Sequence, residues 1–294
     1  MANLATASAA IFTLFPLLAA AFFPVWFAAT TRRLPRLPQI LLPASLAIPY
    51  LLVSLSHHVF TWGWLALYAG LPVAISGSLL WARSLDRGKR GCWIDFLVLL
   101  LLGLAVDLRW FQPAWPARLS AFNKILLLDA GIYGFTALRQ LSGVGFDLRI
   151  RLNDLKVALR EVALYMPIAL ALGLGLRFLH LHPSAPWMGQ VRQLPPAWVF
   201  TFFFVAVPEE LFFRGWIQNL LERRLGRQPA LLVTSVLFGL AHFNKRAAHF
   251  NWRYVLLAAI AGVFYGRAWR QKRRVAASAI THASVDAIWS VWLR

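Results

Sequence analysis

The chain has 294 residues, 60% of them hydrophobic, and a mean hydropathy of +0.61. Soluble domains have an apolar share nearer about 45–50%, so the composition excludes an ordinary soluble protein. The net charge of +19 comes from short basic clusters between apolar segments, which is typical of membrane topology and disfavours a nucleic-acid partner. The single cysteine, Cys92, excludes an intrachain disulfide.

Ten apolar segments are long enough, at about 20 residues each, to cross a ~30 Å hydrocarbon core as helices. They are expected at residues 8–29, 39–56, 60–82, 93–111, 119–138, 161–181, 197–220, 229–243, 254–270 and 275–292. The predicted fold class is therefore all-α, a polytopic membrane helix bundle of about ten transmembrane helices. The first segment lacks the basic region of a cleavable signal, so we expect it to be retained as a span.

Alternate connections between these segments carry two-thirds of the 30 lysines and arginines. The clusters lie within residues 32–36, 83–90, 139–160, 223–227 and 267–274. By the positive-inside rule, this alternation predicts basic loops in the cytoplasm and both termini outside it.

The connection before the sixth segment has an amphipathic pattern. Its apolar residues on one helical face are Leu148, Leu152, Leu155, Leu159 and Val162. This predicts a helix in the headgroup plane, after which the chain turns into the membrane. Because the earlier spans hold few ionisable residues, and the acidic pair and the buried histidines follow this point, we expect a boundary near residue 147. Membrane helices of unassigned role would occupy 1–147, and a second domain would occupy 148–294.

Two adjacent acids, Glu209 and Glu210, lie in a strongly apolar segment. A charged side chain at the centre of a membrane helix costs about 2.5–3.5 kcal/mol, so such residues indicate a functional site. Glu210 and Arg214 are four residues apart and are expected to pair on one helical face, whereas Glu209 is rotated by about 100°. Pro208 is expected to kink or open the helix.

Two later segments repeat the four-residue spacing. Phe238 precedes His242, and His282 precedes Asp286. Alone, His242 is consistent with an interfacial or hydrogen-bonded histidine at a helix end, and His282 with Asp286 is consistent with an intrahelical hydrogen bond. Together with the acids, these residues supply a base, a proton carrier and oxyanion donors for hydrolysis. The expected helix ends place Glu209 and His242 at depths that differ by about 10 Å, a gap that tilt or a break at Pro208 would close.

Three motifs now stand in order on late helices: Glu209-Glu210-x-x-x-Arg214, Phe238-x-x-x-His242 and His282-x-x-x-Asp286. This arrangement resembles the CPBP family of intramembrane proteases, which includes type II CaaX prenyl endopeptidases and bacteriocin-processing relatives. The resemblance covers residues 150–294. It implies a glutamic-type intramembrane endopeptidase that acts in the bilayer on a membrane-anchored or lipidated protein. We expect a multi-pass protein of the bacterial inner membrane.

The resemblance also implies roles for individual residues. Glu209 would activate the attacking water and His242 would hold and polarise it. His282 and Asp286 would stabilise the oxyanion, with Glu210 and Arg214 in support. Because an ionised Asp cannot donate a hydrogen bond, Asp286 is either kept protonated by burial or serves to orient His282.

The sequence leaves alternatives open. A metal-free mechanism is favoured because an acid tied to Arg214 is a poor ligand, but Glu209, His242 and His282 form a possible zinc set. The alternative functions are a non-catalytic binder of the bacteriocin-immunity type and a proton-coupled transporter. The transporter is disfavoured because the chain shows no inverted repeat of broken helices.

Overall fold

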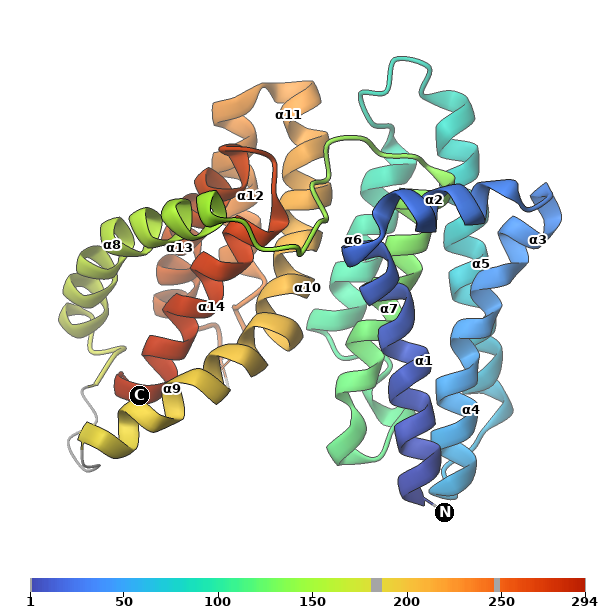
Figure 1. Cartoon of the computed structure of the whole chain (residues 1–294), viewed down its shortest axis with the longest axis horizontal. Helices are drawn as coiled ribbons and strands as arrows, with labels where there is room; N and C mark the ends of the chain where they lie inside the picture. Colours follow the sequence, from blue (N-terminus) through green and yellow to red (C-terminus); the bar gives the residue numbers. More distant parts are fainter. Residues whose placement is uncertain (1, 181–186, 246–248, 294) are drawn as a thin grey trace. The chain divides into compact units, whose positions relative to one another are not determined.

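The computed structural model describes residues 2–180, 187–245 and 249–293, and within these ranges every regular element is a helix (Figure 1). The all-α expectation is therefore confirmed. Helices follow from the composition, because backbone groups in hydrocarbon must find their hydrogen-bond partners within the segment. The chain forms two compact units, Met1–Ser142 and Gly143–Arg294, each described here by itself.

The N-terminal unit contains seven α-helices among its described residues, joined in part by wider or tighter turns. They are α1 (Ala2–Phe22), α2 (Pro24–Arg33), α3 (Arg36–Leu41), a 3₁₀ turn (Leu42–Leu46), α4 (Ala47–Ser56), α5 (Trp62–Leu85), α6 (Trp93–Asp107) and α7 (Ala121–Ile132), which continues as a π-helical segment (Tyr133–Leu138). Helix α1 packs against α4 and α7. The first helix ends at Phe22, earlier than expected, because Pro24 starts α2 in a new direction (Figure 1).

An ion cluster joins three helix ends of this unit. Arg139, which follows α7, pairs with Asp86 after α5 and with Asp95 in the first turn of α6, where Nε lies 2.7 Å from Oδ1. All three side chains are buried. The connections after α5 and after α7 therefore meet at the same end of the unit, as the alternation of basic clusters predicts.

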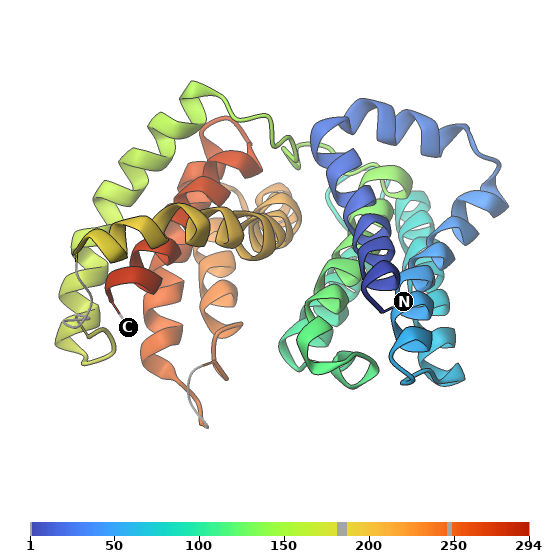
Figure 2. The same cartoon turned by 60° about the horizontal axis from the view of Figure 1, so that its bottom comes forward.

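The C-terminal unit contains α8 (Leu152–Gly175) followed by one long helical run. The run comprises α9 (Trp187–Thr201), a π-helical turn (Phe202–Ala206), α10 (Val207–Glu210), a second π-helical segment (Leu211–Gln218) and α11 (Asn219–Leu225). Three helices complete the unit: α12 (Arg227–Leu240), α13 (Trp252–Arg270) and α14 (Val275–Trp292). In Figure 2, α9 crosses obliquely in front of α13 and α14, and α14 packs against α8, α9 and α13.

The expected surface helix and the sixth span belong to a single helix, α8, which contains Pro167 and bends along its course in Figure 1. The predicted turn into the membrane stays a prediction. Leu152 and Leu159 of α8 face outward, 69% and 72% exposed, as the amphipathic pattern requires. The opposite face carries Asp154 and Glu161, both buried. Asp154 binds Arg274 and Glu161 binds Arg267, and these ion pairs hold the first turns of α8 against the bundle.

Five helical runs among the described residues are long and apolar enough to cross a membrane. They are Leu4–Phe22, Arg36–Ser56, Trp62–Leu85, Leu152–Gly175 and Met188–Leu225. A polytopic helical bundle therefore fits, whereas the count of about ten transmembrane helices stays a prediction.

The start of the C-terminal unit is tied to the connection between α13 and α14. Gly145 has a φ of +73°, and a Cβ there would lie 1.7 Å from the Arg273 carbonyl oxygen, so this close approach requires glycine. Val275 donates a backbone hydrogen bond to the Gly145 carbonyl. Arg274 binds Asp147 at 3.2 Å and Asp154 at 2.8 Å.

We predict that Asp147→Asn destabilises the protein by about 1–3 kcal/mol at neutral pH, because it weakens charge-assisted hydrogen bonds from three arginines, Arg149, Arg151 and Arg274. Asp147 lies before α8, outside the membrane-spanning helices. Burial opposes its ionisation, but hydrogen bonds from Arg149 and Arg274 outweigh burial and lower its pKa. This stability is therefore present above the ordinary Asp pKa of about 3.9 and is lost as pH falls below it.

Thermal unfolding in detergent at several pH values measures this effect. The control is Arg151→Ala, which removes a partner of Asp147 that is 60% exposed and should leave stability unchanged. A difference between wild type and Asp147→Asn that grows on acidification would contradict the prediction.

Candidate active site

Glu209 and Glu210 lie in α10, a single α-helical turn between two π-helical segments. Pro208, in the same turn, has no N–H to donate, so the wider hydrogen-bonding pattern occurs where the sequence predicted an opened helix. π-Helical turns of this kind are frequent at functional sites.

The expected depth difference between Glu209 and His242 is not present. Measured from the α11–α12 connection at about 1.5 Å per residue, Glu209 lies ~24 Å and His242 ~22 Å along the respective helices. The outer helix end expected at residue 197 is not the end of the helix that contains Glu209. The helical run begins well before that residue, and its α9 portion is oblique (Figures 1 and 2).

Glu210 is fully buried between a cation and a histidine. Its Oε2 lies 3.1 Å from Arg214 Nε, and both side chains have no exposed surface. Its Oε1 accepts a hydrogen bond of 2.9 Å from His282 Nδ1. The predicted pair of Glu210 and Arg214 is present, and His282 from α14 is an additional partner of the same carboxylate.

Aromatic rings and a glycine carbonyl complete the surroundings of Arg214. Its guanidinium carbon lies 4.7 Å from the centroid of the Phe238 ring, and Nη2 donates to the Gly262 carbonyl at 3.4 Å. Helices α12 and α13 approach each other closely at Gly262, where a Cβ would lie only 3.0 Å from Ser235 Cα in α12. Gly262 is therefore a close-packing residue between α12 and α13.

His282 lies between two carboxylates. Nδ1 faces Glu210, and Nε2 lies 3.4 Å from Asp286 Oδ2. An imidazole can donate to both acids only when both of its nitrogens carry a proton. The Tyr265 ring stacks on the imidazole with a centroid distance of 4.6 Å and an angle of 14°. This geometry fixes the ring plane of His282.

His242 has a different environment, at the end of α12. Its Nδ1 lies 2.8 Å from the Phe238 carbonyl oxygen. Because a carbonyl only accepts, Nδ1 is the donor, and the neutral ring carries its lone pair on Nε2. The Phe238 ring separates the two histidines, with centroid distances of 4.9 Å to His242 and 5.7 Å to His282.

Glu209 points away from Glu210, as the helical rotation predicted. Its Oε1 lies 3.7 Å from Lys245 Nζ, and its side chain is 25% exposed. The carboxylate also interacts electrostatically with His242. The sequence analysis did not identify Lys245 as a site residue, because it lies three positions after a helix-end histidine with no helical spacing to any acid.

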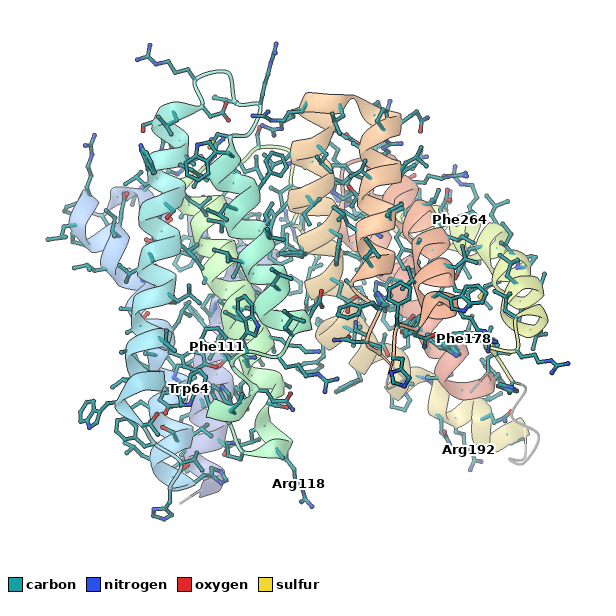
Figure 3. All side chains as sticks on the ribbon, turned by 180° about the vertical axis from the view of Figure 1, so that it is seen from behind. Trp64, Phe111, Arg118, Phe178, Arg192 and Phe264 are labelled. Carbon is teal, nitrogen blue, oxygen red and sulfur yellow. The ribbon has the colours of Figure 1, made fainter. Side chains whose placement is uncertain are left out.

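A cavity of about 50 Å³ brings three of the predicted residues together, and its wall contains His242, His282 and Asp286 but not Glu209. The rest of the wall is aliphatic and aromatic, and its aromatic residues include Tyr165, Phe178, Tyr254, Tyr265 and Trp289; Phe178 is labelled in Figure 3. A cavity of about 10–15 Å³ holds one water molecule. A few water molecules therefore fit in this cavity. The sequence analysis missed these aromatic residues, whose spacing is that of ordinary helix packing.

The zinc alternative was tested against the donor geometry. Among the residues that the structure describes, no three His, Cys, Asp or Glu side chains are arranged to hold a metal ion. Both nitrogens of His282 face carboxylates, so a zinc set of Glu209, His242 and His282 would require His282 to leave one of them. His242 Nε2 is the nitrogen best placed to bind a metal. The choice between the metal-free and zinc mechanisms stays a prediction.

Residues 191–288 match the family model described as type II CAAX prenyl endopeptidase Rce1-like. This segment is an Rce1-like domain. The match includes all three motifs and confirms the family resemblance, and it supports an endopeptidase activity at the level of the family. No curated protein and no solved structure matches the chain significantly.

We predict that Arg214→Met in the Rce1-like domain destabilises the protein by about 3–5 kcal/mol, because it leaves the buried Glu210 without its main counter-charge. The double variant Glu210→Gln/Arg214→Met should recover much of that loss, since both charges are then absent. A double-mutant cycle from thermal unfolding in detergent measures the coupling. Additive effects of the two substitutions would contradict the pairing.

Proposed function

We propose that the chain is a glutamic intramembrane endopeptidase that hydrolyses a peptide bond in a membrane-anchored protein. The observation that carries the proposal is the shared cavity of His242, His282 and Asp286, with Glu209 near His242. The site is buried in an apolar bundle yet has room for water, as hydrolysis within a membrane requires.

In this mechanism Glu209 and His242 position one water molecule from two sides. Water donates one hydrogen to the Glu209 carboxylate and the other to the lone pair on His242 Nε2, so its oxygen lone pair points to the substrate carbonyl. Glu209 takes the proton as the oxygen attacks the carbonyl carbon. A general base in such a position contributes about 10²–10⁴-fold to the rate.

His282 serves as the oxyanion donor in this proposal. Its Nε2–H faces the cavity beside Asp286, which is 29% exposed and able to move aside for a substrate oxygen. Glu210 accepts from Nδ1 and holds the ring protonated and oriented. When the C–N bond breaks, Glu209 returns its proton to the leaving amine nitrogen.

The substrate class follows from the position of the site. A scissile bond must reach a cavity lined mostly by aliphatic and aromatic side chains within the helix bundle, and a chain anchored in the bilayer is held beside that bundle. Localisation in a bacterial inner membrane, and a lipid group on the substrate, remain parts of the proposal.

We predict that Glu209→Gln lowers the cleavage rate of a reconstituted transmembrane peptide substrate at least about 100-fold, because the amide cannot take a proton from water. His242→Gln should lower the rate to a similar extent. Cleavage is measured by mass spectrometry of the products in proteoliposomes.

The matched control is Asp107→Asn, which makes the same carboxylate-to-amide change in the N-terminal unit and should cleave at the wild-type rate. Thermal unfolding checks that each variant remains folded. If Glu209→Gln and His242→Gln cleaved as fast as wild type, the endopeptidase proposal would fail. A binding function that survives both substitutions would then favour the non-catalytic alternative.

A further inference from the structure

A second cavity lies entirely within the N-terminal unit, which none of the three motifs reaches. Its volume is about 230 Å³, and it is bounded by α1, α2, the 3₁₀ turn that follows α3, and α7. The wall is mostly apolar and includes Phe15, Trp26, Phe27, Pro43 and Leu46. Its volume exceeds the roughly 150 Å³ of an apolar cavity known to bind benzene, so a small organic group fits.

One carboxylate lines this cavity. Asp129 of α7 has no exposed surface, and neither of its two oxygens has a hydrogen-bond partner among the residues that the structure describes. The described residues of the wall include no arginine, lysine or histidine. This contrasts with Arg139 in the same unit, which binds two aspartates.

The hydroxyl groups of the wall for which the structure gives contacts donate elsewhere. The Tyr133 hydroxyl donates to the Gln39 carbonyl at 2.8 Å. Thr31 donates to the Phe27 carbonyl at 2.8 Å, and Ser45 donates to the Leu42 carbonyl at 2.7 Å. None of these three hydroxyl protons is directed to Asp129, so these groups leave the Asp129 oxygens open to a donor from a molecule in the cavity.

We propose that this cavity binds an amphiphilic amine, with the ammonium on Asp129 and the apolar chain against the aromatic wall. A buried acid without a partner is unfavourable, and an ionisable residue within a membrane segment indicates a site whose partner must be identified. A cation supplies both the missing charge and the missing hydrogen-bond donors. A neutral alcohol supplies only a donor, and an anion is repelled.

The test uses the full chain in phosphatidylcholine nanodiscs and native mass spectrometry with n-hexylammonium, 1-hexanol and hexanoate as probes. We expect one saturable n-hexylammonium per chain, with binding at least tenfold weaker in Asp129→Asn. Hexanol should bind wild type and Asp129→Asn equally, which shows that the variant keeps an intact cavity. Hexanoate should not bind.

Two further variants complete the design. Thr30→Phe, which fills the cavity from α2, should abolish binding of both the amine and the alcohol. Asp107→Asn changes a carboxylate of the same unit that does not line the cavity, and it should bind n-hexylammonium as wild type does. Equal n-hexylammonium binding by wild type and Asp129→Asn, equally tight binding of hexanol and n-hexylammonium, or no saturable binding would overturn the proposal.

The source of the amine is distinguished by the lipid composition. Nanodiscs that contain phosphatidylethanolamine should yield one retained lipid on wild type, absent from Asp129→Asn, if a lipid headgroup is the occupant. If that lipid is not retained while n-hexylammonium still binds, the occupant is a free amine. Each result supports an amine site and identifies which molecule fills it.

Discussion

The C-terminal unit depends on the need of one buried carboxylate for partners. Glu210 is excluded from water, so its charge must be balanced by protein groups. Arg214, one turn further along the same helical run, and His282, from α14, meet this need. The contact with His282 ties the helical run of α10 to α14. It also orients the imidazole whose opposite nitrogen faces the cavity. The same ion network therefore holds these helices together and orients a side chain of the candidate site.

This network depends on two positions of α13 that carry no side chain, Gly262 and Gly266. A Cβ at Gly262 or Gly266 would collide with Ser235, or with Leu231 and Gln218, so glycine allows neighbouring helices to approach. The Gly262 carbonyl then accepts from Arg214, while Tyr265 of the same helix stacks on His282. Glu210, Arg214 and His282 are consequently buried, whereas Glu209 and Asp286 retain partial exposure, which agrees with the catalytic roles proposed for them.

The same rule applies to the N-terminal unit. There Arg139 joins the ends of α5, α6 and α7 through two aspartates, so its burial is balanced. Asp129 is the exception, since it lines a larger cavity with no partner among the described residues. The other buried carboxylates and arginines named above are paired with opposite charges. Asp129 is therefore the clearest indication of a ligand site outside the Rce1-like domain.

The sequence by itself determined the all-helical class and most helix ends, because long apolar segments in hydrocarbon must form helices. The expected segment 275–292 corresponds to Val275–Trp292. It also determined pairs within one helix, such as Glu210 with Arg214 and His282 with Asp286, since a four-residue spacing places side chains on one face. The catalytic roles and the domain division at residue 147 stay predictions. Only the tertiary structure decided that Glu210 meets His282, that Lys245 meets Glu209 and that the expected surface helix and sixth span form one helix, α8. These contacts join residues far apart in the chain, and they depend on how each helix is rotated and packed, which no local spacing encodes.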